Sequence, residues 1–237
     1  MKQQKLQELK GGALLDRPAT QLLNDFGAGK ASPGSGSAAA LLSILSAKMI
    51  ITVCDISSGK SDCSKSHKEF GYISKQVKDE IEPKLRELFE SDARDFETVV
   101  VLRVKRDKST DTTEKSNYSR EALDLLQIAT DYTFEIADLS LRLMEYGVTI
   151  FEHGWHAIRG DSGVAVSAAM SGVMSSIFII NLNLKTLKRR KYAEENLKRC
   201  QGLQKRLEVL QTKAFSCVTS ISSESLESIQ LELNTNA

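Results

Sequence analysis

The sequence predicts an all-α protein, a bundle of long helices, because it is poor in turn-forming residues and rich in apolar residues at helical spacing. The 237 residues include 3 prolines, where average usage would give roughly 12. No proline follows Pro83, and no glycine lies between Gly71 and Gly147. A β-sandwich or barrel needs turn residues every 8–12 positions or so. We therefore expect one helical domain over residues 1–237, with its core at about 15–215.

The first half of the chain divides into three helices and two loops. Apolar residues predict a short helix at 14–26, a buried helix at 38–56 and a long amphipathic helix at 67–106. Pro83 predicts a bend in the long helix. The glycine-rich segment 27–37 and the polar segment 57–66 are expected to be loops.

In the second half, a charged, Thr-rich loop is expected at 107–116, followed by a helix that Ser119 caps and that runs to Tyr146. Residues 147–163 are expected to be a broken segment because they contain several glycines. One or two helices should follow over 162–220. The Ser/Glu/Asn-rich tail, residues 222–237, is expected to fray or to be disordered.

The composition excludes some classes of partner and site. With 32 Lys+Arg against 31 Asp+Glu, the formal charge is +1, which gives no general reason to expect a nucleic-acid partner. The chain opens with a polar segment and not with a leader pattern. Four cysteines lack a close Cys-x-x-Cys pair and are interpreted as reduced thiols: Cys54, Cys63, Cys200 and Cys217. We expect a cytoplasmic protein.

One segment resembles a membrane span in length. Residues 162–184 carry no charge, and the basic run 185–191 follows them. The segment is nevertheless rich in serine and holds two asparagines. Small residues recur at every fourth position in two rows, Ser167, Ser171, Ser175 and Ala168, Gly172, Ser176. Such rows let another helix approach closely, so a buried bundle helix is favoured over a membrane helix, and the basic run is interpreted as a solvated face.

Two familiar site patterns fail on spacing. Gly-Lys-Ser at 59–61 lacks the glycine that a P-loop needs five positions earlier. Two pairs of residues, His153 with His156 and Cys63 with His67, have ligand-like spacing but no third or fourth partner. We expect no nucleotide loop and no metal site.

Three features can carry chemistry. The segment Pro33, Gly34, Ser35, Gly36, Ser37 opens an apolar helix, where free N–H groups and serine hydroxyls suit an anion or simply cap the helix. Asp92 lies within the amphipathic helix, and Asp161 precedes the uncharged one. A carboxylate against a crowded core can act as a base. The alternatives are a surface residue for Asp92 and an N-cap for Asp161.

These features, in this order, resemble the cyclodeaminase/cyclohydrolase family, which includes formimidoyltetrahydrofolate cyclodeaminase and methenyltetrahydrofolate cyclohydrolase. The similar segments are Pro-Gly-Ser-Gly-Ser at 33–37, Met49 with Gly-Lys at 59–60, Asp-Ala-Arg-Asp-Phe at 92–96, Gly-Asp-Ser-Gly-Val-Ala at 160–165 and Ile-Asn-Leu at 180–182. Together they cover about residues 15–215.

The resemblance implies a homodimer that binds a tetrahydrofolate derivative between helices near the dimer interface, with no further cofactor. By position, Asp92 becomes the general acid/base. The substrate-binding set implied is the 33–37 segment with Lys60 for the anionic folate tail, Asp161, and Asn181 for the pterin or the one-carbon unit.

Some positions differ from the family pattern. Ser35 replaces a glycine, Trp155 and Ile177 replace asparagines, and Lys185 and Lys188 lie where an acidic residue is expected. The alternative hypothesis is therefore a catalytically divergent member that acts as a helical binding or partner-recruiting module.

Overall fold

The computed structural model describes residues 12–235, and every regular element in that part of the chain is helical. This confirms the all-helical prediction. Short elements are η1 (Leu14–Asp16), α2 (Ala19–Phe26), η2 (Ser61–Ser66), α4 (His67–Gln76), η3 (Val77–Ile81) and η4 (His156–Ile158). The long helices are α3 (Ser35–Ser57), α5 (Glu82–Lys108), α6 (Thr112–His153), α7 (Arg159–Thr186) and α8 (Lys191–Thr235).

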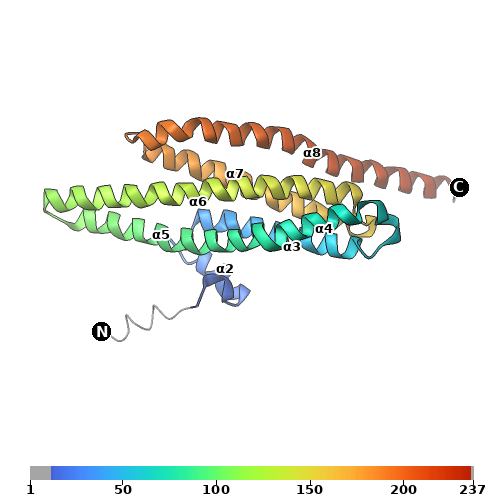
Figure 1. Cartoon of the computed structure of the whole chain (residues 1–237), viewed down its shortest axis with the longest axis horizontal. Coiled ribbons are helices and arrows are strands. Elements are labelled where there is room, and N and C mark those ends of the chain that lie inside the picture. Colours follow the sequence, from blue (N-terminus) through green and yellow to red (C-terminus); the bar gives the residue numbers. More distant parts are fainter. Residues whose placement is uncertain (1–11, 236–237) are drawn as a thin grey trace.

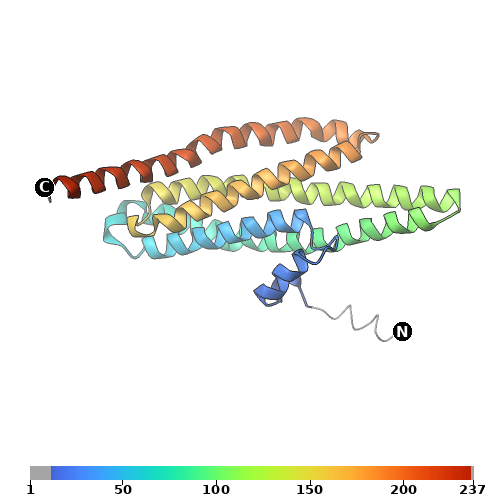
Figure 2. The ribbon, with the colours of Figure 1, turned by 180° about the vertical axis from the view of Figure 1, so that it is seen from behind.

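The long helices lie roughly side by side in an elongated bundle (Figure 1). Helix α3 packs against α5, α6 and α7, while α7 also packs against α6 and α8. Seen from behind, α3 and α7 lie in front, with α8 along one edge (Figure 2). The face formed by α3 and α7 is therefore one side of the molecule.

The centre of the bundle is built from helices with small side chains. Ala39, Ala40 and Ala47 of α3 are fully buried, as expected for the apolar segment 38–56. A Cβ atom added to Gly172 of α7 would collide with the Ser43 hydroxyl. These contacts show why small side chains lie where α3 faces α7: the two backbones approach closely there.

The predicted long helix at 67–106 is present, with one irregular turn. Helix α4 passes through the π-helical turn η3 into α5, and Pro83 lies in the first turn of α5. Proline cannot donate a backbone hydrogen bond, and a π-helical turn just before it accommodates the missing donor.

Two expected breaks are wrong in extent. The loop expected at 107–116 shrinks because α6 begins at Thr112, where the Asp111 carboxylate accepts hydrogen bonds from the backbone N–H groups of Thr113 (2.6 Å) and Glu114 (3.0 Å). The segment expected to be broken from 147 is helical to His153. Gly147 does not end the helix; it lets Val166 of α7 approach α6.

Smaller differences occur elsewhere. The helix expected at 14–26 is divided into η1 and α2, and the helix expected at 38–56 begins at Ser35, inside the expected loop. The segment 57–66, expected to be a loop, contains the 3₁₀ helix η2. The polar tail from Ser222 continues α8 as far as Thr235. Two helical segments, Ser35–Ser57 and His156–Thr186, are long and apolar enough to cross a membrane, a test that buried helices of soluble bundles also pass.

All four cysteines are buried and free. Burial raises the pKa of the Cys54 thiol to about 12, and the neighbouring Asp55 carboxylate adds to the effect. A thiol of this kind is a poor nucleophile at neutral pH.

Candidate functional site

A small cavity lies where the N-terminus of α3 meets α5, α6 and the C-terminal part of α7. Its volume is about 170 Å³. Its lining is Ser35 and Gly36 of α3, Asp92 and Phe96 of α5, Ala129 of α6, and Ile179, Leu182 and Asn183 of α7. Asp92 is the one ionisable residue among these.

Asp92 is buried, with 5% of its surface exposed. Its Oδ2 atom accepts a hydrogen bond of 2.8 Å from the Ser37 hydroxyl, which is itself fully buried. The surface alternative for Asp92 is therefore wrong, and the side chain is held in one orientation at the cavity wall.

Gly36 is required by this arrangement. A Cβ atom at Gly36 would overlap all three terminal atoms of the Asp92 carboxyl group. The absence of a side chain at Gly36 is thus what lets the carboxyl group lie against the N-terminus of α3.

The surroundings favour the protonated form of Asp92. Burial raises the pKa of Asp92 above its ordinary value, hydrogen bonding from Ser37 opposes that rise, and the charge of Asp95 adds to it. A carboxyl group whose pKa moves toward neutrality can both accept and donate a proton under physiological conditions.

The predicted 33–37 segment lies at the cavity. Pro33 is buried, Gly34 forms the extended N-cap of α3, and Ser35 is exposed at the cavity. The Ser32 hydroxyl donates a hydrogen bond of 2.7 Å to the backbone oxygen of Ala93 and so ties the loop to α5. The structure therefore brings this loop and Asp92 together.

The two asparagines of α7 have different positions. Asn181 points toward α8, donating hydrogen bonds to the backbone oxygen of Ile177 (2.8 Å) and to the Cys200 sulfur (3.4 Å). Asn183 lines the cavity instead. Residues two apart on a helix differ by about 200° in direction, so only one of the pair can face the site, and sequence reasoning missed Asn183.

Lys60 and Asp161 lie away from this cavity. Lys60 follows the C-terminal end of α3, and Ser57 at that end is about 30 Å along the helix axis from Ser37 at 1.5 Å per residue. The Lys60 Nζ atom lies 3.8 Å from the centroid of the Trp155 ring. Asp161 lies in the first turn of α7; it is not the N-cap, a position that Ile158 occupies. Within one chain, neither residue joins Asp92.

A second, polar cavity of about 640 Å³ lies at the Lys60 end of the bundle, lined by Asp62, Cys63, Lys65, Ser66, Glu152, His153, Gly154, Trp155 and His156. Within residues 12–235, no group of three or more His, Cys, Asp or Glu side chains is placed to hold a metal ion.

Comparison with known proteins places these residues in a family context. Residues 18–202 match the family model described as formiminotransferase-cyclodeaminase. A methenyltetrahydrofolate cyclohydrolase of Methylorubrum extorquens is 29% identical over 191 residues, covering 80% of this chain and 89% of that protein. The crystal structure of a formiminotetrahydrofolate cyclodeaminase from Thermotoga maritima shares the fold, with a TM-score of 0.75 at 16% identity over 88% of this chain and 99% of that one.

Proposed function

Because the chain belongs to the formiminotransferase-cyclodeaminase family, we propose that it is an enzyme acting on a one-carbon derivative of tetrahydrofolate, with Asp92 as general acid/base. Methenyltetrahydrofolate cyclohydrolase is the first candidate activity, since the curated relative with that name aligns over most of its length. Formimidoyltetrahydrofolate cyclodeaminase is the second, since a protein with that activity shares the fold. The buried Asp92 carboxyl at the cavity wall is the observation that carries the proposal.

Both reactions need one group that moves a proton beside a tetrahedral carbon. In the cyclohydrolase reaction, water adds to the methenyl carbon and Asp92 takes the proton that the water loses. The same carboxyl group then returns a proton to the ring nitrogen as its bond to carbon breaks, and the hydroxyl of the intermediate loses its proton to water, leaving a formyl group. In the cyclodeaminase reaction, N10 attacks the formimino carbon and Asp92 takes the proton that N10 loses. Asp92 then gives this proton to the nitrogen that leaves as ammonia when its bond to carbon breaks. Such proton transfer contributes about 10²–10⁴-fold to a rate.

The cavity at Asp92 is small for a whole folate. Its volume of about 170 Å³ is below the roughly 300–1,000 Å³ of a typical small-molecule site. We propose that it receives the one-carbon unit and the attacking water. Asn183 can offer its amide to this unit, and Ser35 with the first N–H groups of α3 can contact an anionic part of the substrate.

A homodimer would supply the folate-binding surface that the small Asp92 cavity lacks. Helix α7 exposes Val164, Met174, Phe178 and Leu182, which are 42–68% exposed, and the last three recur at every fourth position. If two subunits pack through their α3–α7 faces about a two-fold axis perpendicular to these helices, each end of one subunit lies beside the opposite end of the other. The Lys60 and Asp161 end of one subunit would then lie near the Asp92 cavity of the other. We propose this arrangement, with Lys60 directed to the anionic folate tail.

The test is an absorbance assay for loss or formation of methenyltetrahydrofolate by the purified chain. We expect Asp92→Asn to lower turnover by about 10²–10⁴-fold while the helical circular dichroism stays unchanged. Asp107→Asn is the matched control, the same change at an exposed position of α5. Wild-type protein inactive on both substrates, or full activity in Asp92→Asn, contradicts the proposal. Folate binding without turnover in calorimetry would favour the binding-module alternative.

A further inference from the structure

A larger and mostly apolar pocket lies between the first half of α7 and the C-terminal half of α8. Its volume is about 400 Å³. Its walls come from the end of α6 (Phe151), from α7 (Arg159, Gly160, Gly163, Val166, Ser167 and Met170) and from α8 (Ala214, Phe215, Cys217, Val218 and Ile221). Arg159 is the one charged residue in this lining.

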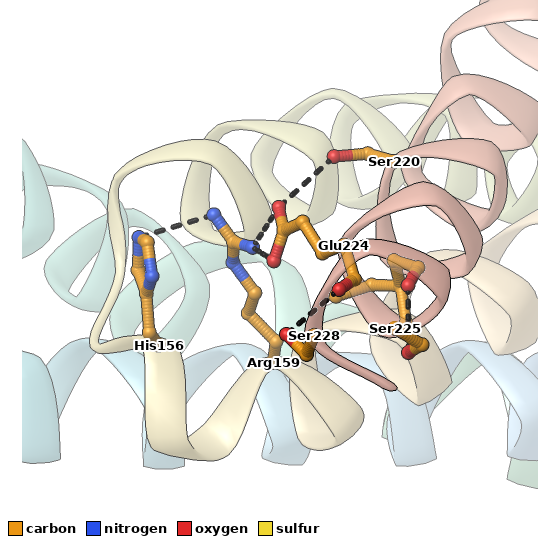
Figure 3. A network of polar contacts seen from close by, with 7 residues as sticks. His156, Arg159, Ser220, Glu224, Ser225 and Ser228 are labelled. Atoms are coloured by element: carbon orange, nitrogen blue, oxygen red, sulfur yellow. Dashed lines mark hydrogen bonds and ion pairs between the residues drawn. The ribbon is translucent and has the colours of Figure 1, made fainter. Parts of the chain in front are cut away.

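The Arg159 guanidinium is surrounded and incompletely paired. Its side chain is 13% exposed. The Nη1 atom donates to both Glu224 oxygens at 2.7 and 2.8 Å, and Nη2 lies 3.0 Å from Nε2 of His156. Figure 3 shows Arg159 between these two residues. The Nε atom is buried and has no hydrogen-bond partner among residues 12–235, so one donor of this partly buried cation is unused.

Two glycines keep the pocket open without being needed for close packing. A Cβ atom added to Gly160 or Gly163 would meet no atom within 4 Å. By contrast, a Cβ atom at Gly172 of the same helix would collide with Ser43. Glycine inside a helix costs about 1 kcal/mol relative to alanine, and at Gly163 no tight contact offsets that cost.

We propose that this pocket binds an amphiphile with an apolar body and a carboxylate head, and that the head is held by Arg159. A guanidinium carries only donors, so the polar part of the ligand must be an acceptor. Glu224 shows that a carboxylate fits this position. It lies on α8 and is itself 51% exposed, so it can move into water when the ligand carboxylate replaces it. The replacement keeps the local charge unchanged and keeps an acceptor on Nη1.

Within one chain, this pocket is distant from the Asp92 cavity. Gly163 and Asn183 are about 30 Å apart along α7 at 1.5 Å per residue. The α8 wall of the pocket, Ala214 to Ile221, also lies beyond the segment 18–202 that matches the family model. The pocket therefore depends on a part of α8 outside the matched segment.

Isothermal titration of the full chain with decanoate, and with decan-1-ol as the uncharged probe, tests the proposal. We expect decanoate to bind more tightly than decanol. Arg159→Met should weaken decanoate binding by at least about tenfold, the value of a charge-assisted hydrogen bond. Arg206→Met, which removes an exposed arginine of α8 paired with Asp138, should leave binding unchanged. Glu224→Gln should tighten decanoate binding by removing the competing carboxylate.

Gly163→Leu provides a variant that fills the pocket without a backbone collision, and it should abolish binding while the protein stays folded. Equal affinity for decanoate and decanol, or undiminished binding in Arg159→Met or Gly163→Leu, overturns the proposal. A wild-type chain that binds neither probe, with Gly163→Leu shifting its sedimentation from dimer to monomer, would show instead that a second copy of the chain fills the pocket. That result also overturns the proposal.

Discussion

The two sides of α7 are packed in opposite ways. On the side toward α3, a methyl group added to Gly172 would collide with Ser43. On the side toward α6, a methyl group added to Gly147 of α6 would collide with Val166 of α7. Toward α8, Gly160 and Gly163 face open space beside a pocket of about 400 Å³. Glycine therefore has two distinct uses in one helix: close approach on the core side and an unfilled volume on the other.

Asp92 and Arg159 are held by different kinds of partner. Asp92 is held by a hydroxyl from Ser37 and lies in the space that Gly36 leaves free. Arg159 is held by a carboxylate, that of Glu224, and retains an unused donor. The first arrangement shifts the pKa of Asp92 and suits proton transfer, whereas the second suits recognition of an anion.

The largest effect is expected from Gly36→Ala in α3, at the wall of the Asp92 cavity. The new methyl group would displace the Asp92 carboxyl from Ser37 and from the cavity. Turnover should fall by at least about 10²-fold, the lower range for loss of a general acid/base. Gly202→Ala, at an exposed position of α8 with no neighbour within 4 Å of the new Cβ atom, is the matched control. Normal turnover in Gly36→Ala would show that the close contact does not position Asp92.

A smaller effect is expected from Gly172→Ala, which tests the packing of α7 on α3. The added methyl group would press on the Ser43 and Ser140 hydroxyls and on the Ala39 backbone oxygen. Overpacking of this kind typically costs about 1–3 kcal/mol. Chemical denaturation should show that loss, and an unchanged midpoint would contradict the close packing described for this side of α7.

The pH dependence of stability should differ between wild type and Asp92→Asn. The pKa of Asp92 is raised in the folded state, so folding favours its protonated form. The contribution of Asp92 is then most favourable below its unfolded pKa of about 3.9 and is lost as pH rises through the folded value. The free energy of unfolding of wild type should therefore fall relative to Asp92→Asn as pH rises. The reverse slope would show that the carboxylate is stabilised by the fold.

The smallest effect, and of opposite sign, is expected from Gly163→Ala on the α8 side. Its Cβ atom would meet no neighbour, so only the helical preference of alanine remains. Stability should rise by up to about 1 kcal/mol. A loss of stability as large as that of Gly172→Ala would mean that the two sides of α7 are packed alike.

Much of the fold was accessible from the sequence because helices are encoded by local periodicity. The sequence predicts the buried helix at 38–56 and the long helix through Pro83, although the first begins three residues earlier than expected, at Ser35. The errors concern glycine and caps. Gly147 was interpreted as a break, although it serves a contact with Val166 that only the tertiary structure reveals. The start of α6 was placed late because the cap at Asp111 was not considered.

The candidate site was predicted in part for a similar reason. Asp92 and the loop 33–37, which the family resemblance assigns to one site, meet at one cavity. Asn183 was missed because sequence does not say which of two neighbouring helix positions faces the site. Lys60 and Asp161 belong to the other end of the bundle, and a sequence does not specify whether a second subunit brings two ends together.

Complementation between subunits tests most directly whether two subunits share the site that contains Asp92 and Lys60. Chains carrying Asp92→Asn and Lys60→Met, with different affinity tags, are co-expressed and the mixed dimer is purified through both tags. If the Lys60 end of one subunit completes the Asp92 site of the other, each single variant is impaired and the mixed dimer keeps one intact site of two. It should then show about half of the wild-type turnover per dimer. Absence of any recovery in the mixed dimer, or full turnover by the Lys60→Met homodimer, would contradict the shared site.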